Sequence, residues 1–275
     1  MSITNRILVV TPTLGESAFL DETLQSVASQ PLNILHVLAV PAGKVEALKA
    51  RYPGTIVVPD AGKEGAIYGA LNAALNAVPE GWDWFTYIND DDLLLPGFGE
   101  MALRHFRRRR PEPVTYGDVE LIDDAGGVLG HITVERSPKW IPALLQEGIS
   151  PLMQQGMLFR RDVVKRLVGF DQRYRLCADL DFWLRAYASG AAFRNYATRV
   201  ARFRVRSGQL SGNTELTQRE QDMIVARNLP IRRTAIRRAL AVIRYRLANL
   251  PRYLARVRSR GFQTSYQILE GGGAA

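Results

Sequence analysis

The sequence predicts an α/β fold in which a mixed sheet is flanked by helices and followed by a basic amphipathic helix. Three observations lead to this prediction. Short apolar runs alternate with helical periods over residues 1–92, as in repeated β-α units. A hairpin-like pair of segments interrupts that alternation in the middle of the chain. Residues 231–260 then combine a helical apolar stripe with ten arginines and no acidic residue.

The first half is predicted to hold four strands, each a short apolar run typical of a buried parallel strand. These strands cover residues 7–10, 34–40, 55–58 and 84–88. Apolar residues recur at helical spacing between the strands, which predicts helices starting near Phe19, Lys44 and Ile67. Repeated units of this kind imply a parallel sheet covered by helices on both faces.

The second half is predicted to be less regular. Residues 114–122 and 128–134 have the pattern of a hairpin, with a glycine-containing turn at 123–127. Helices are predicted over 137–147, 162–167 and 180–189, and strands over 156–159 and 193–203. The four arginines at 107–110 fit the solvated end of a further helix.

The C-terminal segment is predicted to be a separate helical extension. Its apolar residues fall on one narrow helical stripe, formed by Ile236, Leu240, Ile243, Leu247, Leu250 and Leu254. Pro251 should kink or interrupt this helix. Such a helix could lie on an anionic membrane surface or pack on its own domain with its arginines solvated, and the two are compatible. We therefore expect one domain over 1–230, divided at about residue 92 into two halves (1–92 and 93–230), and an extension over 231–270.

The net charge of +9 is confined to the extension. Without the ten arginines of residues 231–260, the chain has 26 basic and 27 acidic side chains. A basic appendage on a neutral body does not indicate a nucleic-acid-binding protein, so no nucleic acid partner is expected.

The cellular setting is predicted to be reducing and cytoplasmic, with a possible peripheral site at the inner face of the membrane. The lone cysteine, Cys177, excludes an intramolecular disulfide and a multi-cysteine zinc site. The first six residues lack the apolar core of a secretory signal, and no apolar run approaches the ~20 residues that span a bilayer.

The acidic run Asp90, Asp91 and Asp92 follows the fourth predicted strand directly. Ligands of open α/β sheets bind beyond the carboxyl ends of strands. Adjacent carboxylates repel one another, and their hard oxygen atoms suit Mg²⁺ or Mn²⁺ bridged to phosphates. A solvated acidic turn or a helix cap would explain the same residues.

Two further segments have the composition of a binding site. Asp179 and Asp181 lie at the start of a predicted amphipathic helix, where Asp179 could cap the helix or act as a general base. Residues 59–72 join a strand to a helix through a glycine-containing loop, but they match neither a dinucleotide-binding nor a phosphate-loop motif.

Taken in order, these segments resemble the family 2 glycosyltransferases with the GT-A fold, a Rossmann-like nucleotide-sugar transferase fold. The matching segments are residues 9–13, 59–72, 89–92, 116–119, 154–161, 169–171 and 178–185. Each is modest alone, and their order and spacing make the combination specific. The resemblance implies an inverting hexosyltransferase that uses a UDP-, GDP- or dTDP-sugar and Mn²⁺ or Mg²⁺, in surface polysaccharide or glycolipid synthesis.

The resemblance also implies roles for single residues. Asp92 and Asp91 would hold the metal, and Asp179 would be the catalytic base. Donor contacts would come from Thr11, Thr13, Glu16, Asp60, Tyr68, Asn72, Asp90, Asp91, Gln209 and Ser211. Gln155 and Asp181 would lie on the side of the acceptor, a glycan or a lipid-linked sugar. Many family members have an Asp- and Ser-rich nucleotide contact after the second strand. Here residues 41–44 are Pro-Ala-Gly-Lys, so the sequence does not predict which nucleotide base is bound.

Two other functions remain as alternatives. A nucleotidyltransferase also joins a nucleotide-binding sheet to acidic metal ligands, but it ordinarily needs a Gly- and Lys/Arg-rich loop after the first strand. Here only Gly15 follows that strand. A catalytically inactive, membrane-associated nucleotide-binding or scaffold protein would have no need of Asp91, Asp92 and Asp179 together.

Overall fold

The computed structural model describes residues 5–62, 66–132, 134–206 and 214–260, and its described strands form a single mixed sheet. The strand order is β3-β2-β1-β4-β8-β6-β9-β5, with β7 paired to β6. The strands are β1 (Ile7–Pro12), β2 (Ile34–Pro41), β3 (Ile56–Asp60), β4 (Trp84–Tyr87), β5 (Leu93–Leu94), β6 (Val114–Ile122), β7 (Val128–Ile132), β8 (Leu158–Arg160) and β9 (Phe193–Arg204). The predicted α/β class with a mixed sheet is therefore confirmed.

The sheet changes direction between β4 and β8. β1, β2, β3 and β4 are parallel, with Ile7 paired to Ile34 on one side and Trp84 on the other. β8 then runs antiparallel to both β4 and β6. β6 and β9 are parallel, whereas β5 and β7 pair with them in the antiparallel sense. The carboxyl end of β4 thus lies at a topological switch point, where ligands of open α/β sheets bind.

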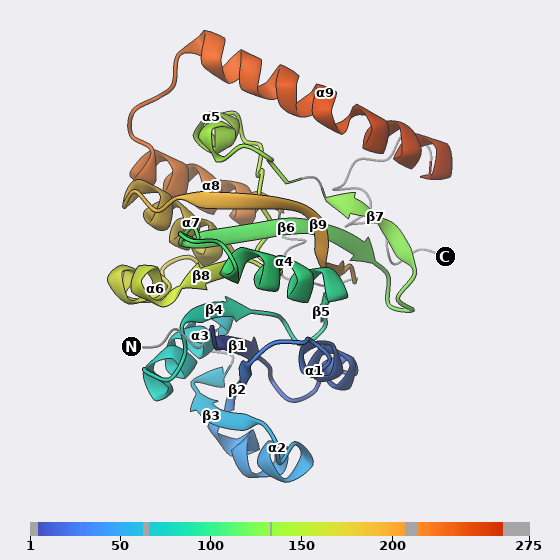
Figure 1. Ribbon diagram of the computed structural model, residues 1–275, viewed down its shortest axis with the longest axis vertical. Coiled ribbons are helices and arrows are strands. Elements are labelled where there is room, and N and C mark those ends of the chain that lie inside the picture. The colour runs from blue at the N-terminus through green and yellow to red at the C-terminus, as the bar shows by residue number, and fades with distance from the viewer. Residues whose placement is uncertain (1–4, 63–65, 133, 207–213, 261–275) are drawn as a thin grey trace.

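Helices cover both faces of this sheet (Figure 1). They are α1 (Leu20–Ala28), α2 (Val45–Arg51), α3 (Ala66–Ala77), α4 (Pro96–Phe106), α5 (Ile141–Leu145), α6 (Arg161–Leu167), α7 (Ala178–Ala188), α8 (Thr214–Asn228) and α9 (Ala235–Arg260). Single 3₁₀ turns, Ala42–Lys44 and Pro138–Trp140, precede α2 and α5. In Figure 1, α2 and α9 lie at opposite ends of the molecule.

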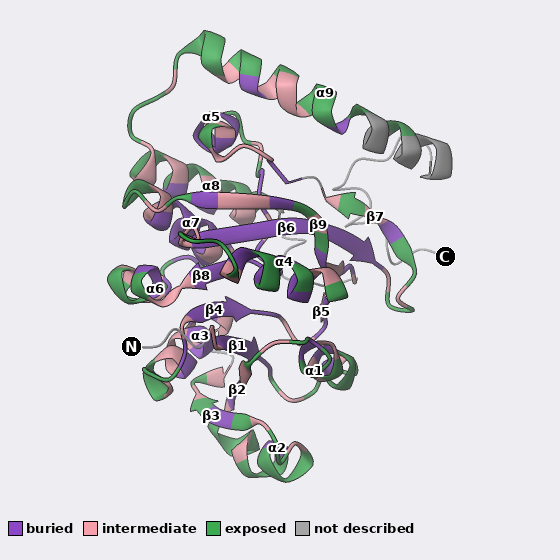
Figure 2. Cartoon of the chain, viewed as in Figure 1, coloured by how far each residue is buried: buried purple, intermediate pink, exposed green. Residues whose placement is uncertain are grey.

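Alternating side chains of β1 divide the core into two layers. Leu8 and Val10 join the cluster formed with α3 and α7, whereas Ile7 and Val9 join the cluster that includes Phe98 of α4. This period of two is the geometry of a strand buried on both faces. Figure 2 shows β1, β4 and β6 buried, while α9 is largely exposed or intermediate.

Several element predictions need correction. The helix predicted over 137–147 is a 3₁₀ turn followed by the short α5, and β5 and α8 were not predicted. The prediction that Pro251 would kink or interrupt the helix is wrong as regards an interruption, since α9 continues through Pro251 to Arg260. A proline removes one backbone hydrogen bond, and the turns on either side can continue the helix. Within the described residues, no helix combines the length and apolarity needed to cross a membrane.

Candidate active site

The acidic run forms the loop between β4 and β5, at the switch point of the sheet. Asp92 is fully buried within it. Its Oδ2 accepts hydrogen bonds from the Gln155 amide at 3.0 Å and the Asn89 amide at 3.3 Å, and its Oδ1 accepts the Arg204 N–H at 2.9 Å. Burial, followed by the negative charge of Asp91, raises the pKa of Asp92 well above its usual value, against the effect of these donors. The site therefore holds a carboxylate whose charge would be stabilised by a cation.

Two arginines from the end of β9 contact the same loop. Arg206 forms an ion pair with Asp91 Oδ2 at 2.9 Å. Arg204 is almost fully buried and donates its Nε–H to the Asp91 carbonyl at 2.9 Å. The Arg204 guanidinium also pairs with Glu22 at 2.7 Å and lies 4.0 Å from the ring centre of Phe19. Positive charge thus already adjoins the acidic loop.

The first of the three acids connects the loop to the end of β1. Thr13 donates its hydroxyl to Asp90 Oδ2 at 2.5 Å, and Ser17 donates to the Asp90 carbonyl at 2.9 Å. Burial raises the pKa of Asp90, and the Thr13 hydrogen bond opposes that rise. Thr13 and Asp90 therefore come together as the resemblance implied, and Ser17 adds a contact that the sequence did not indicate.

Asp179 lies in the first turn of α7, one residue after the start of the helix. Cys177 occupies the cap position and makes no capping side-chain bond. Asp179 Oδ1 accepts the Leu180 N–H at 2.8 Å and lies 3.2 Å from the Tyr68 hydroxyl. Burial raises the pKa of Asp179 to about 6, although these two donors lower it. A carboxyl group with that pKa can accept a proton near neutral pH.

Tyr87, at the end of β4, is affected by the charges of both Asp92 and Asp179. The Tyr87 side chain is buried, and burial is the main reason that its pKa rises well above the usual value. The charges of Asp179 and Asp92 both add to that rise, and Tyr68 is its hydrogen-bonding neighbour. The charges of Asp92 and Asp179 therefore both act on the same buried phenol. Sequence reasoning missed Tyr87, although it is the last strand residue before the acidic loop.

Glu220 of α8 was also not predicted, and it fixes the backbone just before Asp179. Its carboxylate accepts three consecutive N–H groups, those of Arg175 at 2.8 Å and of Leu176 and Cys177 at 2.9 Å each. Glu220 is buried. Three charge-assisted hydrogen bonds to one carboxylate hold this loop rigidly, so α8 helps to position the start of α7.

Two amide oxygens beside Asp92 have no hydrogen-bond partner. Asn89 and Gln155 both donate their amide N–H groups to Asp92, which leaves Asn89 Oδ1 and Gln155 Oε1 buried and unpaired among the described residues. Gly156 follows Gln155 with φ +76°, a conformation that favours glycine, and a Cβ atom there would overlap Val200. Unpaired hard oxygen atoms beside carboxylates fit a site for Mg²⁺ or Mn²⁺.

The described residues contain no group of three or more His, Cys, Asp or Glu side chains arranged to hold a metal ion. Asp91 and Asp92 can thus supply at most part of a coordination shell. This limit suits Mg²⁺-like ions, which are commonly held by one or two carboxylates together with substrate phosphates.

Two expected site residues, Thr11 and Asn72, form hydrogen bonds within the fold. Thr11 is fully buried, and its hydroxyl lies 3.0 Å from His36 Nε2 on β2, so it does not line a pocket. Asn72 uses both ends of its amide on the Phe170 backbone, at 2.9 Å and 2.8 Å. The polar atoms of these two residues therefore form hydrogen bonds inside the sheet and with the loop before α7.

Asp181 is also a structural residue. It is fully buried, forms an ion pair with Arg185 at 2.6 Å and accepts the Asn228 amide at 3.1 Å. Arg185 in turn donates to the carbonyls of Leu167 at 2.6 Å and Gly169 at 2.8 Å. In the structure, both oxygens of Asp181 join α7 to its neighbours.

The remaining expected residues lie at the ends of β1, β3 and α3. Glu16 is largely exposed and pairs with Lys44 at 3.5 Å. Asp60 is partly buried, which raises its pKa, and accepts the Gly62 N–H within its own loop. Tyr68 donates its hydroxyl to the Leu176 carbonyl at 2.8 Å, close to Asp179. Gln209 and Ser211 lie outside the described residues.

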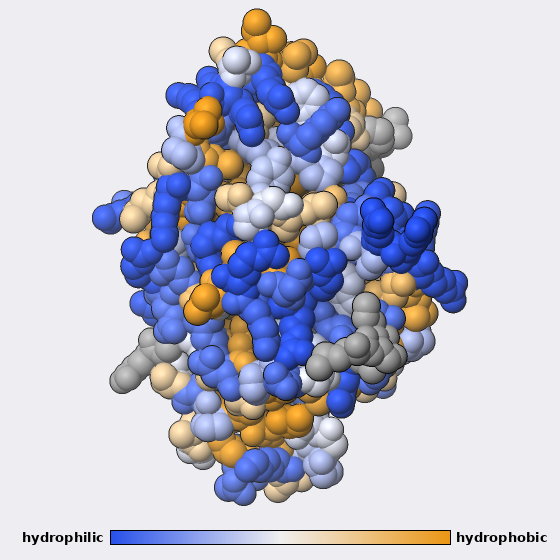
Figure 3. All heavy atoms as spheres, turned by 60° about the vertical axis from the view of Figure 1, so that its left-hand side comes forward, coloured by the Kyte–Doolittle hydropathy of each residue, from blue (hydrophilic) through white to orange (hydrophobic). Residues whose placement is uncertain are grey.

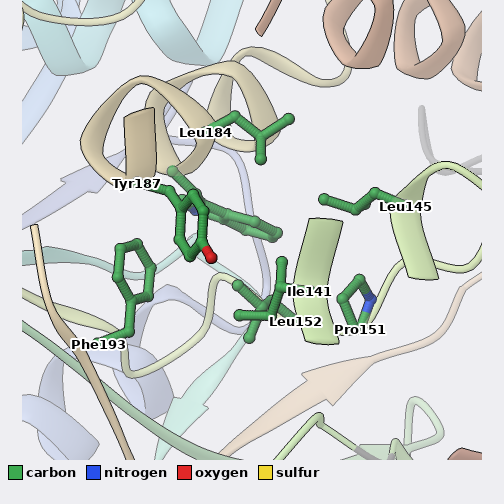
Figure 4. Close-up of a pocket in the computed structure, with 8 residues that line it drawn as sticks. Ile141, Leu145, Pro151, Leu152, Leu184, Tyr187 and Phe193 are labelled. Atoms are coloured by element: carbon green, nitrogen blue, oxygen red, sulfur yellow. The ribbon is translucent and has the colours of Figure 1, made fainter. Parts of the chain in front are cut away.

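A small cavity behind α7 is not part of this site. It lies between α5, α7 and the start of β9, and Figure 4 shows its lining side chains. The lining is apolar, and the volume is about 10 Å³, which is too small for a sugar or a nucleotide.

Comparison with known proteins gives a family and a fold. The family model described as glycosyl transferase family 2 matches residues 8–168. No curated protein matches the chain by sequence. S. aureus TarS 1–349 in complex with UDP-GlcNAc is 15% identical with a TM-score of 0.60, over 96% of this chain and 78% of that chain.

Two further solved structures show the same fold. TarS 1–349 in complex with UDP is 15% identical with a TM-score of 0.58, over 95% of this chain and 76% of that one. The mannosyltransferase PcManGT from Pyrobaculum calidifontis, in complex with GDP-Man and Mn²⁺, is 16% identical with a TM-score of 0.59. That alignment covers 98% of this chain and 79% of PcManGT. The GT-A architecture of the chain is thereby confirmed.

Proposed function

The chain belongs to glycosyl transferase family 2, and from that premise we propose that it transfers a hexose from a nucleoside diphosphate sugar to an acceptor hydroxyl, with inversion at the anomeric carbon. The observation that carries this proposal is the pair of carboxylates, Asp92 in the acidic loop and Asp179 beside Tyr68, whose charges both raise the pKa of the buried Tyr87. One belongs to an acidic loop suited to a cation and a diphosphate, and the other has the pKa of a general base.

The donor side of the proposed site is the acidic loop. Asp91 and Asp92 would hold Mn²⁺ or Mg²⁺, which would neutralise the charge that develops on the departing nucleoside diphosphate. Arg206 now pairs with Asp91 and would be released to the phosphates when a metal takes its place. Mn²⁺ and GDP-Man in PcManGT, and UDP and UDP-GlcNAc in TarS, support such a donor.

The nucleotide is proposed to lie along the ends of the parallel strands. Thr13 holds Asp90 from the end of β1, and Asp60 closes a turn at the end of β3. Glu16 is exposed beside Lys44 at the same edge of the sheet. The donor half would thus span residues 1–92, and the acceptor half would span 93–230.

On the acceptor side, Asp179 would take the proton of the attacking hydroxyl. Its Oδ1 is held by Leu180 and Tyr68, while among the described residues nothing donates to Oδ2. Attack from the side of Asp179, opposite the diphosphate, inverts the anomeric carbon. The acceptor is proposed to be a glycan or a lipid-linked sugar in surface polysaccharide or glycolipid synthesis.

The direct test is turnover with UDP-, GDP- and dTDP-hexoses in the presence of Mn²⁺. We expect release of one nucleoside diphosphate by the wild type, loss of release in Asp179→Asn, and normal release in Asp162→Asn, an exposed acid that pairs with Arg160 outside the site. The product should have the anomeric configuration opposite to that of the donor. Retained configuration, or equal turnover by Asp179→Asn, would contradict the proposed mechanism.

A further inference from the structure

The helix α9 lies along the outer end of the molecule, beyond α5 (Figure 1). One face of the helix attaches it to the domain. Ala241 is fully buried against Ala143 and Leu144 of α5, and Val242 and Tyr245 pack beside it. Asn249, two turns after Ala241, is buried as well. The packed face is therefore the row that contains residues 241, 245 and 249.

Ion pairs fix the rotation of α9 about its axis. Arg244 donates to both carboxylate oxygens of the buried Glu135, each at 2.7 Å. Arg238 is mostly covered and pairs with Glu147 at 2.5 Å, just after α5. A two-oxygen arginine–carboxylate contact has a defined geometry, so the opposite face of α9 is held toward solvent.

That opposite face carries the apolar stripe. Its six large aliphatic side chains are between 49% and 75% exposed: Ile236, Leu240, Ile243, Leu247, Leu250 and Leu254. With 100° between successive helical residues, this row lies roughly opposite Ala241, Tyr245 and Asn249. Figure 3 shows hydrophobic side chains along the top of the molecule, where α9 lies, beside a hydrophilic area. An exposed apolar surface of this extent on an outer edge is typical of an interaction site.

The charge around the stripe identifies what would cover it. Residues 231–260 contain ten arginines and no acidic residue. Arg237 and Arg246 are exposed on the two flanks of the stripe. A second copy of the same helix would bring like charges together, which is unfavourable. An anionic lipid surface, with an apolar interior and negative headgroups, complements both the apolar stripe and its basic flanks.

We propose that α9 docks this protein on an anionic lipid bilayer. The aliphatic stripe enters the boundary between headgroups and acyl chains, and the flanking arginines contact the lipid phosphates. This inference goes beyond the sugar transfer and does not depend on it. If the transfer is also correct, docking would bring the site to acceptors that are linked to lipid.

The test is co-sedimentation of the full chain with vesicles of phosphatidylcholine alone or mixed with phosphatidylglycerol. We expect binding to the mixed vesicles that weakens as salt is raised, because exposed charges are screened. Ile243→Glu with Leu247→Glu should weaken this binding by at least about tenfold, since it places two acids within the stripe. Arg237→Gln with Arg246→Gln should produce a smaller loss that is confined to the anionic vesicles.

The matched control is Ile56→Glu with Met223→Glu, which makes the same charge change at two exposed apolar residues outside α9. It should bind vesicles as the wild type does. Equal binding by the stripe variant, or no vesicle binding by the wild type, would overturn the proposal. A stripe-dependent dimer, or capture of an acidic protein without vesicle binding, would also overturn it. Nucleotide binding measured on each variant separates failure of docking from failure of the transferase site.

Discussion

The acidic loop after β4 and the first turn of α7 both place a carboxylate in the site, but their surroundings differ. Around Asp92, three donors occupy the two oxygens, and two arginines adjoin the loop. Around Asp179, the donors reach only Oδ1, and among the described residues no cation pairs with it. The first arrangement holds negative charge in place for a cation, whereas the second leaves an oxygen available for a proton. The same residue type thus serves two chemical purposes because its neighbours differ.

The largest expected effect is that of Asp179→Asn, compared with Asp181→Asn two residues later. Asp179→Asn should lower kcat by roughly 10²–10⁴-fold, the usual contribution of a general base, and leave donor binding intact. Because folding raises the pKa of Asp179 from 3.8 to about 6, stability is lost as the pH rises between these values, and the full cost remains above about 6. The asparagine variant should therefore gain up to ~3 kcal/mol of stability at neutral pH.

Asp181→Asn should have the opposite effect on stability. It leaves Arg185 without its charged partner, and breaking a buried ion pair costs ~3–5 kcal/mol. Urea unfolding of both variants, alongside turnover, measures the contrast. If both variants lost stability and activity together, the distinction between a base and a structural acid would be wrong.

The pH dependence of turnover is the next prediction. Asp179 acts as a base only when it is ionised, so kcat should fall about tenfold per pH unit below a pKa of about 6. Above that pH the rate should reach a plateau. Initial rates in constant-ionic-strength buffers would show this, and a midpoint near the usual aspartate value would contradict the raised pKa of Asp179.

A smaller effect is expected for Glu220→Gln, which weakens the support of the loop before Asp179. We predict a decrease in kcat of about tenfold with little change in the donor KM, because about 1.4 kcal/mol of positioning would be lost. The negative charge of Glu220 also raises the pKa of Asp179, so the pH midpoint should move downward. Glu215→Gln, an exposed change on the same helix, should alter neither quantity. An unchanged pH midpoint in Glu220→Gln would mean that Glu220 has only a structural role.

The smallest effect compares two threonines at the end of β1. Thr13→Val removes the hydroxyl that holds Asp90, and loss of one such bond should weaken donor binding by roughly 5–10-fold. Thr11→Val removes a hydroxyl that faces His36 and should leave donor binding unchanged. Calorimetric titration would measure both. If both variants weakened donor binding equally, Thr11 would also contribute to the nucleotide pocket.

The secondary-structure elements that were predicted are those with a clear apolar pattern in their own sequence. The four parallel strands were predicted because each is a short apolar run between helical periods. β5 was missed because a two-residue strand has no periodicity of its own, and it forms only by pairing with β9. α8 was missed because its exposed surface is polar almost all round, so it lacks an apolar stripe.

Sequence reasoning reaches residues that lie within a motif and misses contacts that depend on the tertiary fold. Asp90, Asp91, Asp92 and Asp179 were proposed as site residues from their places after a strand or at a helix start and from the family resemblance. The structural partner of Asp181, Asn228, could not be predicted because α8 contributes it. Arg204 and Glu220 could not be predicted, since only the fold brings them to the acidic loop and to the start of α7.

The most direct test of the central claim is thermal unfolding with UDP, GDP and dTDP, each with and without Mn²⁺, for the wild type and Asp92→Asn. A nucleotide at ~100 times its Kd should stabilise the wild type by roughly 2.7 kcal/mol, measured as a higher Tm. We expect a Mn²⁺-dependent rise with one nucleotide that disappears in Asp92→Asn and persists in Asp162→Asn. No rise with any nucleotide, or an equal rise in Asp92→Asn, would contradict a metal-dependent donor site in the acidic loop.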